Sequence, residues 1–137
     1  MLDNASHEFI RKIWGASPAP IDSWRFAKKA GIIVMETKLP HRVCAVLVCK
    51  INVTPRIHIT PDGDERSKKN HCAVATGFFF LNKIMQNENY QHICFCHAPV
   101  KTMEEKIAHR FAEILTRYAT NPAVQDVRKT DHKKLSF

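Results

Sequence analysis

The chain has 137 residues, of which 45% are hydrophobic and 25% charged, and its formal net charge is +8 at pH 7. These values are typical of a globular protein with one hydrophobic core, and they exclude a wholly disordered chain and a chain of two full domains. The N-terminus lacks the pattern of a secretory signal, and the longest apolar stretches, 43–49 and 78–81, are far too short to span a bilayer. We therefore expect a soluble, cytoplasmic protein without membrane contact.

The first predicted elements are two helices joined by a linker. Residues 1–14 carry apolar side chains at helical spacing, and the segment 15–20 then breaks the pattern with Gly, Ser and two prolines. A second, short helix is predicted to begin at a capping residue, Asp22 or Ser23, and to stop at Gly31. Both helices therefore precede the first extended segment.

Three extended segments follow the short helix. The first and third alternate between apolar and polar residues, whereas the second is almost entirely apolar. Pro40 and Pro55, which are unfavourable inside strands, separate the segments. We expect an antiparallel meander of three strands, over residues 32–38, 43–53 and 56–60.

A long helix is predicted over residues 65–85, after the turn sequence 61–64. Ten of the fourteen residues in 72–85 are apolar and surround the helix on nearly all sides, which indicates a central, buried element. A strand over 92–97 and a helix over 102–120 follow. This order predicts an α+β fold in which a small antiparallel sheet of three to four strands packs on helices.

The first half of the long helix contains a zinc-binding motif from which most of the metal chemistry is missing. In a His-Glu-x-x-His helix, two imidazoles lie one turn apart on one face, with the Glu beside them as general base. Here His71 stands at the first position, Cys72 replaces the Glu and Ala75 replaces the second His. The surrounding segments are therefore needed to identify the motif.

Those segments resemble the ImmA/IrrE family of small zinc metallopeptidases from about residue 20 to residue 116. Their order and spacing carry the resemblance, in the segments 26–32, 56–60, 65–66 and 106–115. The resemblance implies a zincin-like, metallopeptidase-like domain. We therefore divide the chain into an N-terminal helix and linker, 1–20, this domain, 21–120, and a basic C-terminal tail, 121–137. The resemblance also implies that Ile107 stands in place of the carboxylate zinc ligand on the later helix.

Zinc catalysis requires about three protein ligands, an open position for water and a general base. Of the four positions that the resemblance assigns to the site, only His71 carries a suitable group, because Ala75 and Ile107 cannot bind a metal. The Cys72 thiol diverges from His71 by about 100° around the helix and is expected to pack in the core. We therefore expect no catalytic residue, no cofactor, and a vestigial site at His71, Cys72, Ala75 and Ile107, with His71 a hydrogen-bonded, buried or rim histidine.

Replacement ligands on the later helix are not expected either. Ile107 begins an apolar stripe that continues through Phe111, so position 107 is predicted to face the core. Glu105 and His109 share a different face and are predicted to face solvent.

A second set of possible ligands lies on the last predicted strand. His92, Cys94 and Cys96 alternate along it and would share a face, with His97 pointing away. With His71 or Cys72 they could bind zinc or copper. The interpretation that we favour is a buried strand whose cysteines act as small hydrophobic residues. The five cysteines lack paired C-x-x-C spacing, so we expect reduced thiols rather than disulfides or a structural zinc site.

The favoured hypothesis is a catalytically inactive ImmA/IrrE-like protein that acts by binding a protein partner. The resemblance implies a partner of the helix-turn-helix repressor kind and a role in controlling phage, mobile-element or stress genes. One alternative is a metal-dependent endopeptidase with a rebuilt site that cleaves such a repressor. Another is a basic regulator that contacts nucleic acid through Arg66, Lys68, Lys69, Arg128, Lys129, Lys133 and Lys134.

Overall fold

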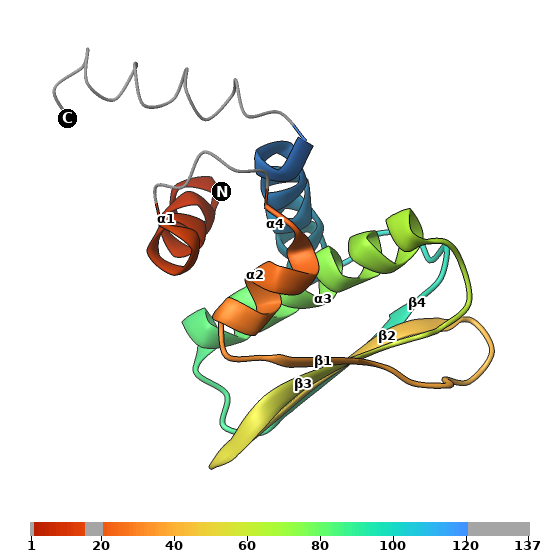
Figure 1. Ribbon diagram of the computed structural model, residues 1–137. Helices are drawn as coiled ribbons and strands as arrows, with labels where there is room; N and C mark the ends of the chain where they lie inside the picture. Colours follow the sequence, from red (N-terminus) through yellow and green to blue (C-terminus); the bar gives the residue numbers. More distant parts are fainter. Residues whose placement is uncertain (1, 16–20, 121–137) are drawn as a thin grey trace, which may run out of the picture.

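Four helices and a four-stranded sheet form from the described part of the chain, residues 2–15 and 21–120 of a computed structural model (Figure 1). The predicted α+β class is therefore confirmed. Most of the predicted linker and all of the predicted tail, 121–137, lie outside the described residues. The elements are α1 (Asp3–Trp14), α2 (Ser23–Lys29), β1 (Ile33–Glu36), β2 (Val43–Lys50), β3 (Val53–Ile59), α3 (Glu65–Met85), β4 (Tyr90–Phe95) and α4 (Met103–Thr120).

The sheet is mixed, so the predicted antiparallel meander is wrong. Its strand order is β1-β3-β2-β4, in which β2 pairs antiparallel with β3 and β4, whereas β1 pairs parallel with β3. The nearly all-apolar β2 takes an interior position with a neighbour on each side, which leaves β1 at the edge beside β3. Thr37 extends the parallel pairing, because its N–H donates to the Ile59 carbonyl at 2.9 Å.

The turn between β2 and β3 lies at residues 51–52, earlier than the predicted break at Pro55. Asn52 has a φ of 59°, a left-handed conformation that asparagine tolerates in tight turns. The pairing register shifts between Val48 and Lys50, so β3 carries one extra residue in a bulge. Pro55 lies at this bulge, before the pairing with β1 begins, and a missing N–H is tolerated there.

Side-chain caps fix where three of the helices begin. Asp22 caps the first turn of α2, and Asp64 accepts a hydrogen bond from the Ser67 N–H of α3 at 2.8 Å. Before α4, Thr102 and Glu105 each accept a hydrogen bond from the other's backbone N–H, at 3.1 and 3.0 Å, in a capping box. The predicted start of the long helix at residue 65 is confirmed, and so is its end at residue 85.

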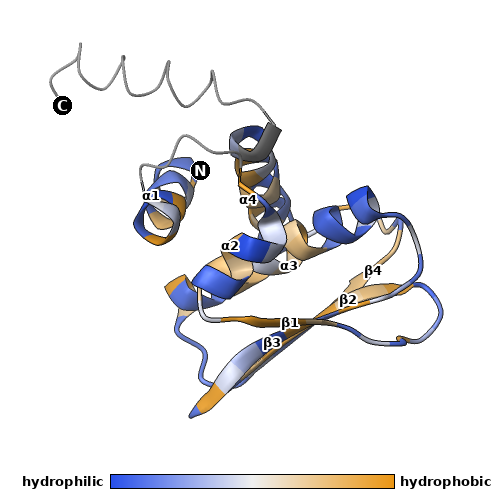
Figure 2. Cartoon of the chain, in the orientation of Figure 1, coloured by the Kyte–Doolittle hydropathy of each residue, from blue (hydrophilic) through white to orange (hydrophobic). Residues whose placement is uncertain are grey.

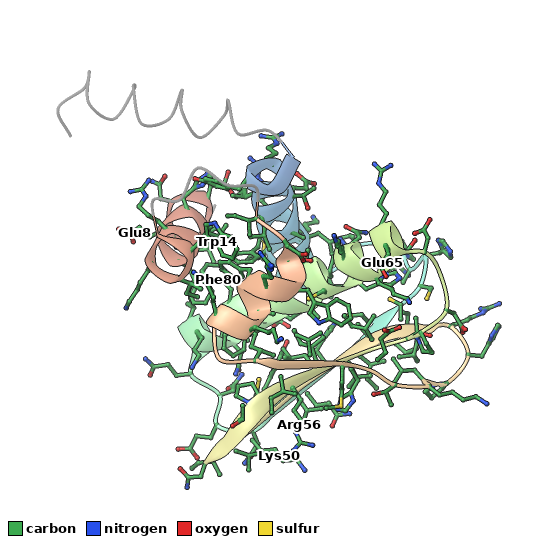
Figure 3. The ribbon with its side chains drawn as sticks, in the orientation of Figure 1. Glu8, Trp14, Lys50, Arg56, Glu65 and Phe80 are labelled. Carbon is green, nitrogen blue, oxygen red and sulfur yellow. The ribbon has the colours of Figure 1, made fainter. Side chains whose placement is uncertain are left out.

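The helices lie on one face of the sheet, with α3 crossing it (Figures 1 and 2). Phe78 and Phe79 of α3 pack with Leu47 and Ile57 of the sheet in the main core. On the other side of α3, a second cluster joins α1, α2 and α4 around Phe80. Figure 3 shows Phe80 between α1 and α3, with Lys50 and Arg56 projecting away from the helices. None of the helices in the described segments is long and apolar enough to cross a membrane.

A close contact between α3 and α4 occurs at Gly77 and Ala108. A Cβ atom added at residue 77 would overlap the backbone carbonyl of Ala108, so only glycine allows this approach. Ala108 is fully buried, whereas Ile107 is half-buried and packs against the second cluster. The contact therefore sets the rotation of α4 about its own axis.

Candidate functional site

An open cleft of about 810 Å³ lies between α3, β4, the start of α4 and the segment 39–44. Five of the eight histidines of the chain line it, from five different segments: His41, His71, His92, His97 and His109. Imidazoles donate and accept hydrogen bonds, and they bind protons near neutral pH. The cleft is therefore the strongest candidate site in the part of the chain that the structure describes.

His71 lines this cleft from α3 and is half-buried. Burial lowers the pKa of its imidazole, and the nearby His97 ring lowers that pKa further. The ring is therefore neutral at neutral pH and can both donate and accept a hydrogen bond. This placement fits the expectation of a buried or rim histidine.

Cys72 points away from the cleft toward α2. Its thiol lies 3.6 Å from the Ser23 carbonyl oxygen, and the side chain has no exposed surface. Burial raises the pKa of the Cys72 thiol to about 12, so the thiol is protonated at neutral pH. Cys72 thus packs in the core, and it shares no site with His71.

Neither of the remaining positions of the vestigial site lines the cleft. Ala75 is fully buried in the main core, and Ile107 faces a smaller pocket beside α1. Instead, α4 contributes Glu105 and His109 to the cleft. The sequence predicted that these two side chains face solvent; both are partly exposed and lie along the open cleft, because Ala108 rather than Ile107 lies closest to α3.

His92 and Cys94 share the inner face of β4, as predicted. The His92 ring stacks on Phe78 with the ring centroids 3.6 Å apart. Burial lowers the pKa of His92, although the carboxylates of Glu105 and Glu104 oppose this shift. Cys94 is 8% exposed, and burial raises the pKa of its thiol to about 12.

β4 ends at Phe95, so the predicted strand 92–97 is too long at its C-terminal end. Cys96 and His97 form a turn in which His97 has a φ of 58°, and strand alternation no longer applies. His97 therefore lines the cleft rather than pointing away from it. Within residues 2–15 and 21–120, no three His, Cys, Asp or Glu side chains are grouped closely enough to hold a metal ion.

Three of the basic residues predicted to contact nucleic acid, Arg66, Lys68 and Lys69, lie near the start of α3. Lys68 forms a 2.8 Å ion pair with Glu36, and Lys69 lies 3.6 Å from a carboxylate oxygen of Asp22. Arg66 is exposed and lines a second pocket, of about 850 Å³, beside α2. Two of the three cations therefore have carboxylate partners within the chain. The other candidates, Arg128, Lys129, Lys133 and Lys134, lie outside the described residues.

The sequence did not indicate the contributions of His41, Arg42 and Cys44 to the cleft. Cys44 lies at an irregularity of the β2–β4 pairing between Val43 and Ala45, and its thiol donates to the Cys94 carbonyl at 3.3 Å. The only hint in the sequence that Cys44 lines the cleft was its position inside an apolar strand, and that pattern is also typical of ordinary core cysteines. No family model, curated protein or solved structure matches the chain significantly.

Proposed function

We propose that the protein is a catalytically inactive ImmA/IrrE-like protein that binds an extended segment of a protein partner along β4, beside the cleft. The observation that carries the proposal is the open edge of β4, the last strand of the sheet, next to a cleft with hydrogen-bonding side chains. The resemblance in sequence suggests a helix-turn-helix repressor as the partner, and the control of phage, mobile-element or stress genes as the setting.

The backbone of β4 has hydrogen-bonding groups directed to that open edge. The Cys96 N–H donates to the Arg42 carbonyl at 2.7 Å, on the β2 side. Because these groups alternate along an antiparallel strand, the N–H groups of Gln91, Ile93 and Phe95 point to the open edge. A partner strand needs only such backbone groups to extend a sheet, and nearby pockets then select its side chains.

The burial of Cys72 and Ala75 supports a role without catalysis. Both side chains have no exposed surface, although they stand where the resemblance expects the general base and the second zinc ligand. His71 is the one member of the vestigial set that lines the cleft. A rebuilt site that uses both His71 and Cys72 is disfavoured, because the Cys72 thiol points toward α2 whereas His71 lines the cleft.

The test compares Ile93→Pro with Ile93→Ala in binding to a partner captured from the host and then titrated in purified form. The proline removes an N–H at the open edge, whereas the alanine keeps it and removes a 41% exposed side chain. We expect I93P to bind about 5- to 13-fold more weakly than I93A, because loss of a backbone hydrogen bond costs roughly 1–1.5 kcal/mol.

Circular dichroism and thermal unfolding of both variants serve as the control for folding. Equal affinities for I93P and I93A would contradict binding along β4. Cleavage of the partner by the wild-type chain, abolished by EDTA, would instead favour the endopeptidase alternative. Binding to DNA that weakens steeply with salt would favour the nucleic-acid alternative.

A further inference from the structure

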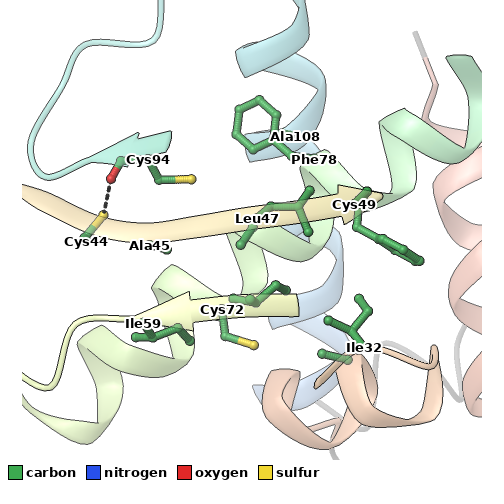
Figure 4. Packing of buried hydrophobic residues seen from close by; sticks show 14 residues of the cluster. Ile32, Cys44, Ala45, Leu47, Cys49, Ile59, Cys72, Phe78, Cys94 and Ala108 are labelled. Atoms are coloured by element: carbon green, nitrogen blue, oxygen red, sulfur yellow. Dashed lines mark hydrogen bonds between the residues drawn. The ribbon is translucent and has the colours of Figure 1, made fainter. Parts of the chain in front are cut away.

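No described helix covers the face of the sheet that is opposite α3 (Figure 1). Residues paired across a sheet project from the same face, and the pairing register gives two rows of side chains on this side. The rows cross β1, β3 and β2 and define what we call the outer face: Ile33, Arg56 and Val48, then Met35, His58 and Val46. The alternate residues Leu47 and Ile59 have no exposed surface, and Figure 4 shows both in the buried cluster on the helix side.

Most side chains of the outer face are apolar. Ile33 is 41% exposed, and Val46 and Val48 are half-buried without a described helix over them. Ile93 of β4 pairs with Val46 and is also 41% exposed, so it continues the second row. Apolar side chains that are exposed together rather than singly are typical of a contact surface. Four strands about 4.8 Å apart are wide enough for one helix, about 10 Å in diameter, to lie on them.

The charged side chains on this side of the sheet are basic. Arg56 of β3 and Lys50, at the end of β2, are exposed and project away from the helices (Figure 3). Neither forms an ion pair within residues 2–15 and 21–120, whereas Lys68, Lys69 and Arg110 on the helix side each have a carboxylate partner. The two rows contain no carboxylate. An occupant of the outer face is therefore complementary in charge when it is acidic.

We propose that the outer face binds an amphipathic helix of a partner protein, in which acidic side chains flank an apolar stripe. The stripe lies on Val46, Val48 and Ile93, and the acidic side chains pair with Lys50 and Arg56. Apolar anchors one turn apart are the usual way in which such a helix docks. The contact uses side chains of the sheet face, whereas strand addition at β4 uses backbone groups of the open edge, so either can fail without the other.

Two other occupants fit the outer face less well. A second copy of the chain would bring Arg56 and Lys50 against the same cations, and the net charge of +8 opposes self-association. Nucleic acid would satisfy the cations, but bases stack on aromatic rings, and the apolar side chains of the two rows are aliphatic. An acidic, amphipathic helix satisfies both the aliphatic and the basic side chains.

The experiment titrates two synthetic peptides into the labelled full-length chain and follows methyl resonances by NMR. Both peptides have about 18 residues, enough for an isolated helix, and the same leucine stripe, flanked by glutamates in one and by lysines in the other. We expect the glutamate peptide to shift the methyl resonances of Ile33, Val46 and Val48. It should bind about tenfold more tightly than the lysine peptide, because two ion pairs replace two repulsions.

Three variants test which side chains are responsible. Arg56→Glu should weaken binding of the glutamate peptide about fivefold and strengthen binding of the lysine peptide. The matched control, Arg25→Glu, makes the same change of charge at an exposed position of α2 and should alter neither affinity at physiological ionic strength. Val48→Thr keeps a β-branched side chain and should weaken both peptides about threefold, because it removes an apolar contact.

Equal affinities of the two peptides would overturn the proposal, and so would equal effects of Arg56→Glu and Arg25→Glu. Shifts confined to the cleft or to the helices would also overturn it. An oligo(dT) strand that shifts the same methyl resonances and displaces the glutamate peptide would assign the outer face to nucleic acid instead. A dimer in sedimentation experiments that Val48→Asp disperses would assign it to a second copy.

Discussion

Replacing Gly77 with alanine should destabilise the fold, although alanine is the better helix former. An added Cβ would lie 2.9 Å from the Cα and the carbonyl carbon of Ala108, and closer to its carbonyl oxygen. Ordinary nonbonded carbon atoms stay about 3.5–4.0 Å apart, so α4 must move away from α3. The atoms in contact belong to the backbone, and no side-chain rotation can relieve the overlap.

The expected loss of stability follows from two opposing terms. Overpacking a core costs about 1–3 kcal/mol, and the upper end applies because the overlap is with backbone. Alanine in a helix interior stabilises the fold by about 1 kcal/mol relative to glycine. The net cost is about 2 kcal/mol, which corresponds to a decrease of roughly 6–10 °C in Tm for a domain of this size.

Thermal and urea unfolding of wild-type and Gly77→Ala protein measure this effect. The double variant with Ala108→Gly should not recover stability, since the overlap does not involve the Ala108 methyl group. An unchanged or higher Tm for the single variant would refute the reasoning. It would also contradict the rotation of α4 that turns Glu105 and His109 toward the cleft.

Three further predictions concern ionisable side chains. Burial raises the pKa of Cys72 from its ordinary value of 9.0 to about 12, so folding favours the protonated thiol and stability is lost as the pH rises from about 9 to 12. Cys72→Ala should flatten that decline in urea unfolding. Burial lowers the pKa of His92, so the unfolded chain binds a proton more readily than the folded chain, and stability is lost as the pH falls below about 6.5. His92→Phe keeps an aromatic ring against Phe78 and should weaken this loss of stability in acid, measured by thermal scans. Asp64→Ala should cost about 1 kcal/mol in the same scans, because it removes the cap on the Ser67 N–H.

Local sequence patterns predicted the elements of the fold better than their arrangement. The buried helix over residues 65–85 was predictable because its proline-free run, its preceding turn and its apolar surface agree with one another. The parallel pairing of β1 with β3 was not predictable from local patterns, because it depends on which strand occupies the middle of the sheet. The hairpin turn was predicted too late in the chain because Pro55 was taken as a break between strands. A proline is tolerated at this position of β3 because it lies at a bulge, and a bulge forms only when the strands pair.

The candidate site was predictable only in part, for the same reason. His71, and the shared face of His92 and Cys94, follow from positions within single elements. The inclusion of Glu105 and His109 depends on the contact between Gly77 and Ala108, which no periodicity encodes. Apolar stripes describe a helix face only to within about one residue position, or 100° of rotation, when a small residue such as Ala108 makes the closest contact.

Elemental analysis of the purified full-length chain tests most directly the claim that the scaffold binds a partner without zinc chemistry. We expect far less than one zinc per chain and a Tm that EDTA leaves unchanged. About one tightly bound zinc per chain, lost together with stability in His71→Ala, would contradict it.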